Sequence, residues 1–534
     1  MWVKKCDLAA LKSIQSCQMW VKKCDLAKLK SKSLLIYRII SNFATDLITV
    51  IMEKFIGREK EIERLLNCYR SNRSEFVILY GRRRIGKTFL VNHTFKGKFS
   101  FYYTGLHNVP LSRQLEKFAE ALQEYGALPL KPQFNNWYHA FDALKAILKS
   151  SKNNKKKVIF LDEMPWMSSR NSNFVSALED FWNTWAALRD DIILIATGST
   201  TSWMVDHLLR NKGGLYNRIT CKIYLRQFNL QECEQYLRAH RCYWDRYTIT
   251  QYYMYLGGVP FYLSLLSYDK TLEENIDSLF FDSQAKLARE FYDLYDAQFT
   301  DAGRYVELIK VLVEHREGMT RQEITKATSL IGGGLSTMLE NLERNDLVKS
   351  YNRYGNKRKG TLYRVADFFT IFYLKYVNGV RHRPSRYWLA KSSTPSVAAW
   401  RGLTFELVCL LHIDQINQAL GITGMLTTES CWRSSQAQEV DRPGKQKKAQ
   451  IDMIIERSDR IIHLCEMKFS TERFIITKEY EEDLRDKMTI FRQETKTTKM
   501  LNLTFVTTHG VANGLHSGIV QSQVTIDDLF EILK

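Results

Sequence analysis

An eight-residue motif at positions 81–88 constrains this chain more than any other part of its sequence. It reads GRRRIGKT and fits the pattern G-x-x-x-x-G-K-[ST] in full. The apolar run 76–80 before it predicts a buried strand, and residues 88–91 after it open a helix. Glycines let backbone N–H groups curl around phosphates at a helix N-terminus. The motif therefore predicts a phosphate-binding loop (P-loop) for ATP.

The loop assigns roles to individual residues. Lys87 is expected to contact the β- and γ-phosphates, and Thr88 to hold Mg²⁺. The predicted ATP-binding set in this region is Gly81, Arg82, Arg83, Arg84, Ile85, Gly86, Lys87, Thr88 and Phe89.

A second apolar strand, 158–161, ends in Asp162 and Glu163. Asp162 is predicted to bind Mg²⁺ through water, and Glu163 to orient or deprotonate the attacking water. The alternative is a strand with a solvated acidic end. The gap after the P-loop leaves room for an inserted strand, which we place at 99–103.

A third strand, 192–196, is followed by Thr197-Gly198-Ser199. A hydroxyl here can hydrogen-bond the γ-phosphate or its water, and we assign this role to Ser199. Ordinary turn chemistry explains the same residues equally well.

These segments, with the opening 55–59 (FIGRE), resemble the archaeal-type ATPases of the signalling (STAND-like) branch related to AAA+ proteins. The resemblance implies that Arg58 and Pro260 lie at the nucleotide, Pro260 within a Gly-x-Pro motif near the adenine. It also implies that Arg218 senses the γ-phosphate, although a surface cation is the alternative. The chain departs from the family at Asn217, where glycine is usual, and at Gln227, where proline is usual. The predicted catalytic set is Lys87, Glu163, Ser199 and Arg218.

Residues 303–366 are typical of a winged helix-turn-helix. Helical patterns at 303–317, 320–329 and around 335–342 precede two strands, 347–351 and 360–365. The loop between the strands is basic, which is typical of a phosphate-contacting wing. The alternative is a wing that docks on protein. The predicted DNA contacts are Arg353, Lys357, Arg358 and Lys359.

Three acids and a lysine stand out after residue 400. Glu406 lies in a helical pattern, Asp452 in an apolar strand, and Glu466 and Lys468 in the next strand, two residues apart and therefore on one face. If residue 456 pairs with residue 462, Asp452 lies opposite Glu466. Such a group can hold Mg²⁺ and stabilise charge during phosphodiester hydrolysis.

This order resembles the PD-(D/E)XK nuclease fold. With 367–373 (DFFTIFY) and Gly402-x-x-Phe405-Glu406, it also resembles the uncharacterised DUF234 domain, which occurs fused to such ATPases. The resemblance implies nuclease ancestry; an active site and an idle one both remain open. The expected fold class is α/β: a P-loop NTPase parallel sheet, a winged helix-turn-helix and a PD-(D/E)XK-like α/β domain. The expected domains are 52–265 (ATPase), 266–302 (helical linker), 303–366 (winged helix) and 367–534 (DUF234-like).

Residues 1–51 look foreign to the rest. The segment MWVKKCDLA occurs at 1–9 and again at 19–27, and globular patterning begins at Met52. The apolar stretch 33–52 is interrupted by Arg38, Asn42 and Asp46, which argues against a membrane span. We interpret 1–51 as an extension from an upstream start codon. Removing its nine basic and three acidic residues from the net charge of +19 leaves +13.

The basic excess favours a polyanionic partner, and nucleic acid is our prediction. Ten scattered cysteines without C-x-x-C pairs indicate a reducing compartment, with neither disulfides nor zinc. The chain is predicted to be a cytoplasmic, Mg²⁺-dependent ATPase acting as a nucleotide switch on a DNA-associated, nuclease-like domain, with no membrane partner. The alternative is a regulatory or signalling scaffold whose nuclease-like domain is inactive. The sequence leaves open a homo-oligomer.

Overall fold

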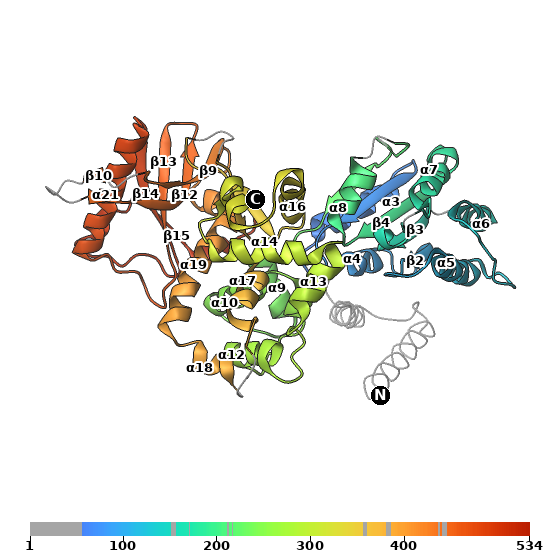
Figure 1. Cartoon of the computed structure of the whole chain (residues 1–534), viewed down its shortest axis with the longest axis horizontal. Coiled ribbons are helices and arrows are strands. Elements are labelled where there is room, and N and C mark those ends of the chain that lie inside the picture. The colour runs from blue at the N-terminus through green and yellow to red at the C-terminus, as the bar shows by residue number, and fades with distance from the viewer. Residues whose placement is uncertain are drawn as a thin grey trace, which may run out of the picture. The chain divides into compact units, whose positions relative to one another are not determined.

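The computed structural model describes residues 56–150, 156–169, 171–210, 213–215, 217–355, 360–380, 386–435, 438–439 and 446–533 (Figure 1). The predicted extension 1–51 lies outside these residues, as do Lys357, Arg358 and Lys359 of the predicted wing.

A five-stranded parallel sheet of order β2-β3-β4-β1-β5 occupies the first half of the described chain (Figure 1). Its strands are β1 (Glu75–Tyr80), β2 (Phe99–Thr104), β3 (Lys157–Asp162), β4 (Ile192–Gly198) and β5 (Cys221–Tyr224). Strands β3 and β4 are buried along their whole length because helices cover both faces, as their unbroken apolar runs require. The inserted strand was predicted correctly: β2 pairs with β3.

The helices of this region are α3 (Glu59–Arg70), α4 (Lys87–Thr94), α5 (Leu111–Gly126), α6 (Trp137–Ser150), α7 (Phe174–Thr184) and α8 (Thr201–Met204). Because β1, β3 and β4 are neighbours in the order β1-β4-β3, the chain segments that follow them meet at one edge of the sheet. The P-loop, the acidic pair and the hydroxyl segment all lie on that edge.

A second hydrophobic core begins just after β5. It contains buried residues from Phe228 to Phe530, whereas the core of the parallel sheet contains residues from Phe76 to Leu215. The helices that start it are α9 (Leu230–Ala239), α10 (Arg246–Leu256), α11 (Pro260–Leu263), α12 (Leu272–Ile276) and α13 (Glu290–Gln298). Aromatic pairs such as Tyr253–Phe368 and Tyr262–Phe369 join these helices to residues after 367.

Three helices and a small antiparallel sheet follow. They are α14 (Ala302–Glu314), β6 (Met319–Thr320), α15 (Arg321–Ala327), α16 (Gly332–Arg344), β7 (Val348–Tyr351) and β8 (Leu362–Val365), with sheet order β6-β8-β7. Thr320 and Glu323 form a capping box that starts α15. The buried stripe of α16 is Leu335, Met338, Leu339 and Leu342.

The last region combines helices with a mixed sheet of order β15-β14-β13-β12-β9. Its strands are β9 (Thr427–Arg433), β12 (Gln450–Arg457), β13 (Ile461–Lys468), β14 (Met500–Thr507) and β15 (Ser522–Thr525), with β10 (Gln438–Glu439) and β11 (Gln446–Lys447) as a separate pair. Its helices are α17 (Phe368–Phe372) with its π-helical extension Tyr373–Val377, α18 (Tyr387–Lys391), α19 (Pro395–Leu411), α20 (Ile413–Ala419), α21 (Lys478–Thr495) and α22 (Ile526–Leu529).

The register of the β12–β13 hairpin confirms the sequence prediction. Glu456 pairs with Ile462, and the pairing runs to Met453 and Cys465, the residues next to Asp452 and Glu466.

Within the described residues, no single helix has the length and apolarity of a membrane span; the bent pair Pro395–Leu411 and Ile413–Ala419 passes that test only as a pair.

Candidate functional site: the P-loop and a distal acidic cluster

The P-loop is closed around its own lysine. The Lys87 ammonium is buried and donates to the carbonyl oxygens of Gly81 (2.9 Å) and Arg82 (2.8 Å). Burial lowers the pKa of Lys87 to about 8, although Glu163 and Asp162 act in the opposite direction. A dehydrated lysine held at a helix start is suited to bind a phosphate.

Two glycine positions are required by backbone geometry. Gly81 has φ +142°, and a Cβ there would meet the Leu225 carbonyl oxygen at 2.3 Å. A Cβ on Gly258 would lie 1.8 Å from the Phe228 carbonyl oxygen. The absence of a side chain at Gly81 and Gly258 therefore lets the P-loop and the Gly-x-Pro segment approach the backbone of residues 225–228, which follow β5.

Thr88 and Asp162 form the predicted metal pair. The Thr88 hydroxyl lies 3.0 Å from both carboxylate oxygens of Asp162. The Thr197 hydroxyl at the end of β4 also donates to Asp162. Burial raises the pKa of Asp162, and the hydrogen bonds from Thr197 and Thr88 partly offset this. The pair thus presents oxygen ligands of the kind that Mg²⁺ prefers.

Glu163 is held by the serine that the sequence assigned to nucleotide sensing. The Ser199 N–H and hydroxyl both donate to Oε2 of Glu163, each at 2.9 Å. The Glu163 N–H donates to the Thr197 hydroxyl at 3.2 Å, and its φ of +49° places Glu163 in the left-handed region. Two hydrogen bonds therefore orient this carboxylate at the strand ends, and a third holds its backbone.

The side chains of the three loop arginines point away from the lysine and bind later segments of the chain. Arg82 makes a buried, two-pronged ion pair with Asp367, in which Nη2 lies 3.2 Å from Oδ2. Arg84 pairs with the buried carboxylate of Glu290 at 2.7 Å. Arg83 donates to the Asp293 carbonyl oxygen at 3.3 Å. These contacts engage the three side chains and leave the loop backbone for the predicted phosphate contacts.

The remaining predicted nucleotide residues lie around this centre. The buried Arg58 guanidinium donates to the Arg226 carbonyl oxygen at 2.5 Å and lies over the Phe228 ring. Pro260 starts α11, whose Phe261 N–H is 3.4 Å from the Arg84 carbonyl oxygen.

Two predicted residues are more exposed. Phe89 has 54% of its side chain exposed. Arg218 is also exposed, and no described residue holds its side chain. Asn217 has φ +56°, which explains why glycine is usual at that position.

The residues present fit ATP and a divalent cation. Helix α4 starts at Lys87, and its N-cap residue Gly86 has no side chain to cap it, so its first N–H groups remain available to an anion. When bound, the cation would supply positive charge to the phosphates, and Thr88 and Asp162 are the residues that would hold it.

The four residues of the predicted nuclease centre come together in the C-terminal region. Burial raises the pKa of Glu406 to about 7, and the negative charges of Asp452 and Glu466 raise it further. The positive charges of Arg364 and Lys468 lower the pKa and offset part of this shift. The carboxylates on α19, β12 and β13 are thus close enough to repel one another.

Two lysines balance the negative charge of the Glu466 carboxylate. It accepts hydrogen bonds from Lys487 (2.7 Å) and Tyr480 (2.8 Å) on α21 and lies 3.1 Å from the Lys468 ammonium. Burial alone would raise the pKa of Glu466, but Lys487 and Lys468 lower it overall. In the part of the chain that the structure describes, no three acidic, histidine or cysteine side chains form a ready metal site.

Arg353 of the predicted wing lies beside Asp452. Both line a cavity of about 30 Å³ between the small sheet and the C-terminal sheet, together with Arg364 and Arg433. The cavity brings basic side chains and one acid of the cluster together.

Several functional contacts were missed at the level of sequence. The sequence analysis assigns the sensing role to Ser199 and none to Thr197, and it includes Asp367 only in a family resemblance. The spacing of seven puts Tyr480 and Lys487 on one face of α21, but no sequence signal places that face over Glu466.

Comparisons with known proteins identify a matching family and several similar chains. Residues 55–266 match the family model of an ATPase domain predominantly from Archaea. The uncharacterized protein MJECL04 of Methanocaldococcus jannaschii is 24% identical over 330 residues, which cover 60% of this chain and 69% of that protein. The uncharacterized ATP-binding protein MJ0423 of the same organism is 41% identical over 44 residues, or 8% of this chain and 75% of that protein. Among solved structures, the Walker-type ATPase PABY2304 of Pyrococcus abyssi is similar, with 16% sequence identity and a TM-score of 0.44. The superposition covers 60% of this chain and 97% of the PABY2304 chain.

Together, the P-loop geometry and the family match define the class of protein. The chain belongs to the archaeal-type ATPases: it binds ATP, and it is an ATPase.

Proposed function

We propose that this protein is an ATP-driven switch that controls a DNA-associated, nuclease-like C-terminal domain. The observation that carries the proposal is the buried ion pair between Arg82 of the P-loop and Asp367. It links the residue that follows Gly81 to the first residue of the predicted C-terminal domain.

A short chain of contacts supports the transmission of nucleotide state. Lys87 donates to the Arg82 carbonyl oxygen, so a phosphate that attracts the ammonium competes with a bond to the loop. The Arg82 side chain holds Asp367, and Asp367 caps α17 by accepting from the Thr370 N–H at 3.0 Å. Three successive contacts therefore connect the phosphate site to α17.

A second set of contacts supports the same coupling. Arg84, with φ +69°, pairs with Glu290, which also accepts from the Tyr262 hydroxyl at 3.0 Å. The Arg84 guanidinium lies 4.1 Å above the Phe261 ring, next to Pro260. Hydrolysis would alter the loop, and these contacts would pass the alteration to α11 and α13.

The nuclease-like part of the proposal rests on topology and charge. Helix α19 carries Glu406, and the hairpin strands β12 and β13 carry Asp452 and Glu466, which is the helix–strand–strand order on which the PD-(D/E)XK resemblance rests. Glu406, Asp452, Glu466 and Lys468 interact electrostatically. In the winged-helix interpretation of 303–366, Arg353 supplies a phosphate contact beside Asp452.

Cleavage assays test this proposal. Single- and double-stranded DNA is incubated with the protein and Mg²⁺ or Mn²⁺, with and without ATP, beside an Asp452→Ala/Lys468→Ala variant and a Lys87→Ala variant. We expect cleavage that the double variant loses and that responds to ATP only when Lys87 is present. Cleavage by the wild type that ATP leaves unchanged would contradict the switch.

The second candidate function is an ATP-binding regulator with an inactive nuclease-like domain. The pairing of Glu466 with Lys487, Lys468 and Tyr480 favours it, because these contacts occupy both carboxylate oxygens. Under this alternative, the wild type cleaves nothing with any metal or nucleotide while still binding ATP.

A further inference from the structure

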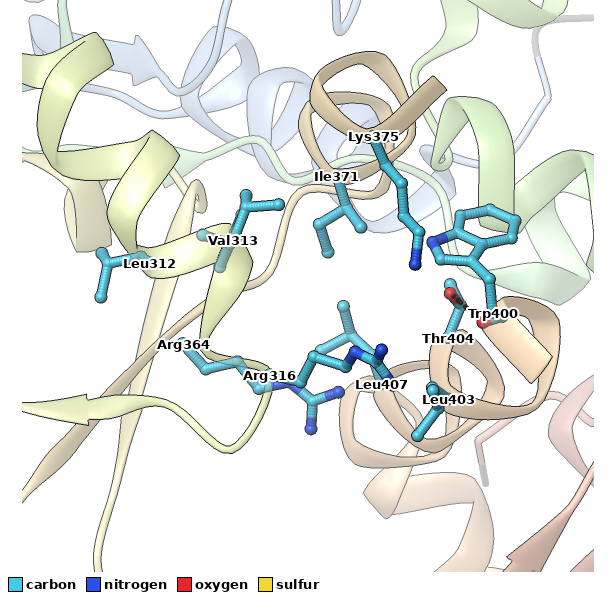
Figure 2. A pocket seen from close by; sticks show the side chains of 11 residues that line it. Leu312, Val313, Arg316, Arg364, Ile371, Lys375, Trp400, Leu403, Thr404 and Leu407 are labelled. Atoms are coloured by element: carbon cyan, nitrogen blue, oxygen red, sulfur yellow. Dashed lines mark hydrogen bonds between the residues drawn. The ribbon is translucent and has the colours of Figure 1, made fainter. Parts of the chain in front are cut away.

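A cavity of about 60 Å³ lies between α14, β8, the π-helical extension of α17, and α19 (Figure 2). It lies outside the ATP site, and Asp452, Glu466 and Lys468 are not among the residues that line it. Its volume is enough for a few water molecules or one tetrahedral oxyanion.

The polar walls of the cavity are dominated by hydrogen-bond donors. Arg316, Arg364 and Lys375 contribute two guanidinium groups and an ammonium from three different elements. In Figure 2, Lys375 and Trp400 approach the open space from one side, and Arg316 approaches it from another. None of the described residues that line the cavity is acidic. Lys375 and Arg316 also repel each other, which adds to burial in lowering the pKa of Lys375.

Trp400 supplies an independent sign that a ligand belongs here. Its side chain is only 3% exposed, and its indole N–H has no acceptor in the described structure. Buried donors are rarely left without a partner, because desolvation is then uncompensated. Thr404, also on the wall, donates to the Trp400 carbonyl oxygen at 2.7 Å and so uses its own hydrogen inside α19.

Arg364 connects this cavity to the acidic cluster. It lines both the 60 Å³ cavity and the cavity that contains Asp452. Its positive charge acts against the upward pKa shifts of Glu406 and of Tyr351. A ligand at Arg364 would thus lie next to, but not inside, the predicted nuclease centre.

We infer that the cavity formed by Arg316, Arg364, Lys375 and Trp400 binds a phosphate group. A phosphate offers several acceptor oxygens in a tetrahedral arrangement, which suits donors that come from several directions better than a planar carboxylate does. The rest of the wall is an apolar surface that could contact an attached sugar or base. It consists of Leu403, Leu407 and the Trp400 ring. The phosphate is carried either by a nucleic-acid backbone or by a free nucleotide. The inference requires neither ATP hydrolysis nor DNA cleavage.

Binding experiments on the full chain test this site. A Lys87→Ala background removes phosphate binding at the P-loop, and calorimetry then follows inorganic phosphate, AMP and a short oligonucleotide without terminal phosphates. Arg316→Gln and Lys375→Gln remove exposed cations and should leave the fold intact. Trp400→Phe keeps the ring and removes the N–H. Lys310→Gln on α14, an exposed cation outside the cavity, is the matched control.

We expect the Arg316 and Lys375 variants to bind about tenfold more weakly, as for loss of a charge-assisted hydrogen bond. Trp400→Phe should weaken binding less, and Lys310→Gln should leave it unchanged. Equal losses for all three probes indicate a site for free phosphate compounds, whereas losses for the oligonucleotide alone indicate a backbone phosphate. The inference is overturned if no probe binds, or if every probe binds the variants as tightly as the parent.

Because ATP binding to the otherwise wild-type protein is measured separately, failure here is distinguishable from failure of the ATP switch.

Discussion

The P-loop site and the C-terminal acidic cluster both contain buried or half-buried charged side chains, but their charges are balanced differently. At the P-loop, Lys87 is held by backbone carbonyls, and Thr88 and Asp162 already face each other. In the acidic cluster, Glu466 is paired with Lys468 and Lys487, while burial raises the pKa of Glu406 to about 7.

This difference separates two ways of building a site. The residues of the ATP site follow neighbouring strands of a parallel sheet, so the sheet topology alone brings them to the same edge. The acidic cluster needs a helix and two strands to pack correctly, and its charges are then balanced by α21. In the first region a phosphate has only backbone carbonyls to displace from Lys87, whereas in the second a metal would have to displace the lysine partners of Glu466.

The largest expected effect is on ATP hydrolysis, which should depend on the P-loop region and not on the acidic cluster. Glu163→Gln should lower ATP hydrolysis by about 10²–10⁴-fold while ATP affinity is retained, because the amide cannot accept a proton. Asp452→Asn should leave hydrolysis unchanged. Phosphate release and nucleotide titration measure both. Hydrolysis by Glu163→Gln at the wild-type rate would remove this residue from the mechanism.

The next effect concerns the link between the regions. Arg82→Ala leaves the Asp367 carboxylate buried without its partner and should lower the free energy of unfolding by about 3–5 kcal/mol. Arg83→Ala, at a half-buried neighbour with one long contact, should cost about 0.5 kcal/mol or less.

Arg82→Met/Asp367→Asn should recover most of this loss, since no unpaired charge remains and asparagine can still cap α17. Denaturant titration measures all three variants. A double variant as unstable as Arg82→Ala would show that the charge pair is not the cause.

A pH effect should appear in the second hydrophobic core. Burial lowers the pKa of His412 to about 4 from an ordinary value of 6.5. Its Nε2 accepts the Leu230 N–H at 3.1 Å, which only the neutral ring can do. The stabilisation is complete above pH 6.5 and is lost as the pH falls towards 4, by up to about 3 kcal/mol.

His412→Gln should flatten this part of the stability–pH curve. Unfolding measured at several pH values checks it, and an equal slope in both proteins would assign the acid sensitivity elsewhere.

The smallest effect concerns the lysine partners of the acidic cluster. Lys487→Gln should raise the pKa of Glu466 and lower the free energy of unfolding at neutral pH by about 1–2 kcal/mol, because a half-buried ion pair is lost. Lys478→Gln, an exposed change on the same helix, is the control. A loss of equal size in both variants would show that α21 itself is sensitive, not the pair.

Sequence patterns predicted the parts of this molecule that local chemistry determines. The strand–loop–helix around Lys87, the acidic end of β3, the inserted strand β2 and the 456–462 register all follow from short-range rules. The destinations of the loop arginines did not follow, because Asp367 and Glu290 are more than 200 residues from their partners and no periodicity connects them. The neutralisation of Glu466 was missed for a similar reason: it depends on how α21 packs over β13.

Hydrogen exchange tests the central claim of coupling most directly. Backbone exchange of residues 367–377 is compared in the full chain with Mg²⁺–ADP, with a non-hydrolysable Mg²⁺–ATP analogue and without nucleotide, in the wild type and in Arg82→Met/Asp367→Asn. The account predicts that exchange in this segment differs between the two nucleotides in the wild type, and that the double variant loses the difference while still binding both. Equal exchange with both nucleotides in the wild type would contradict it.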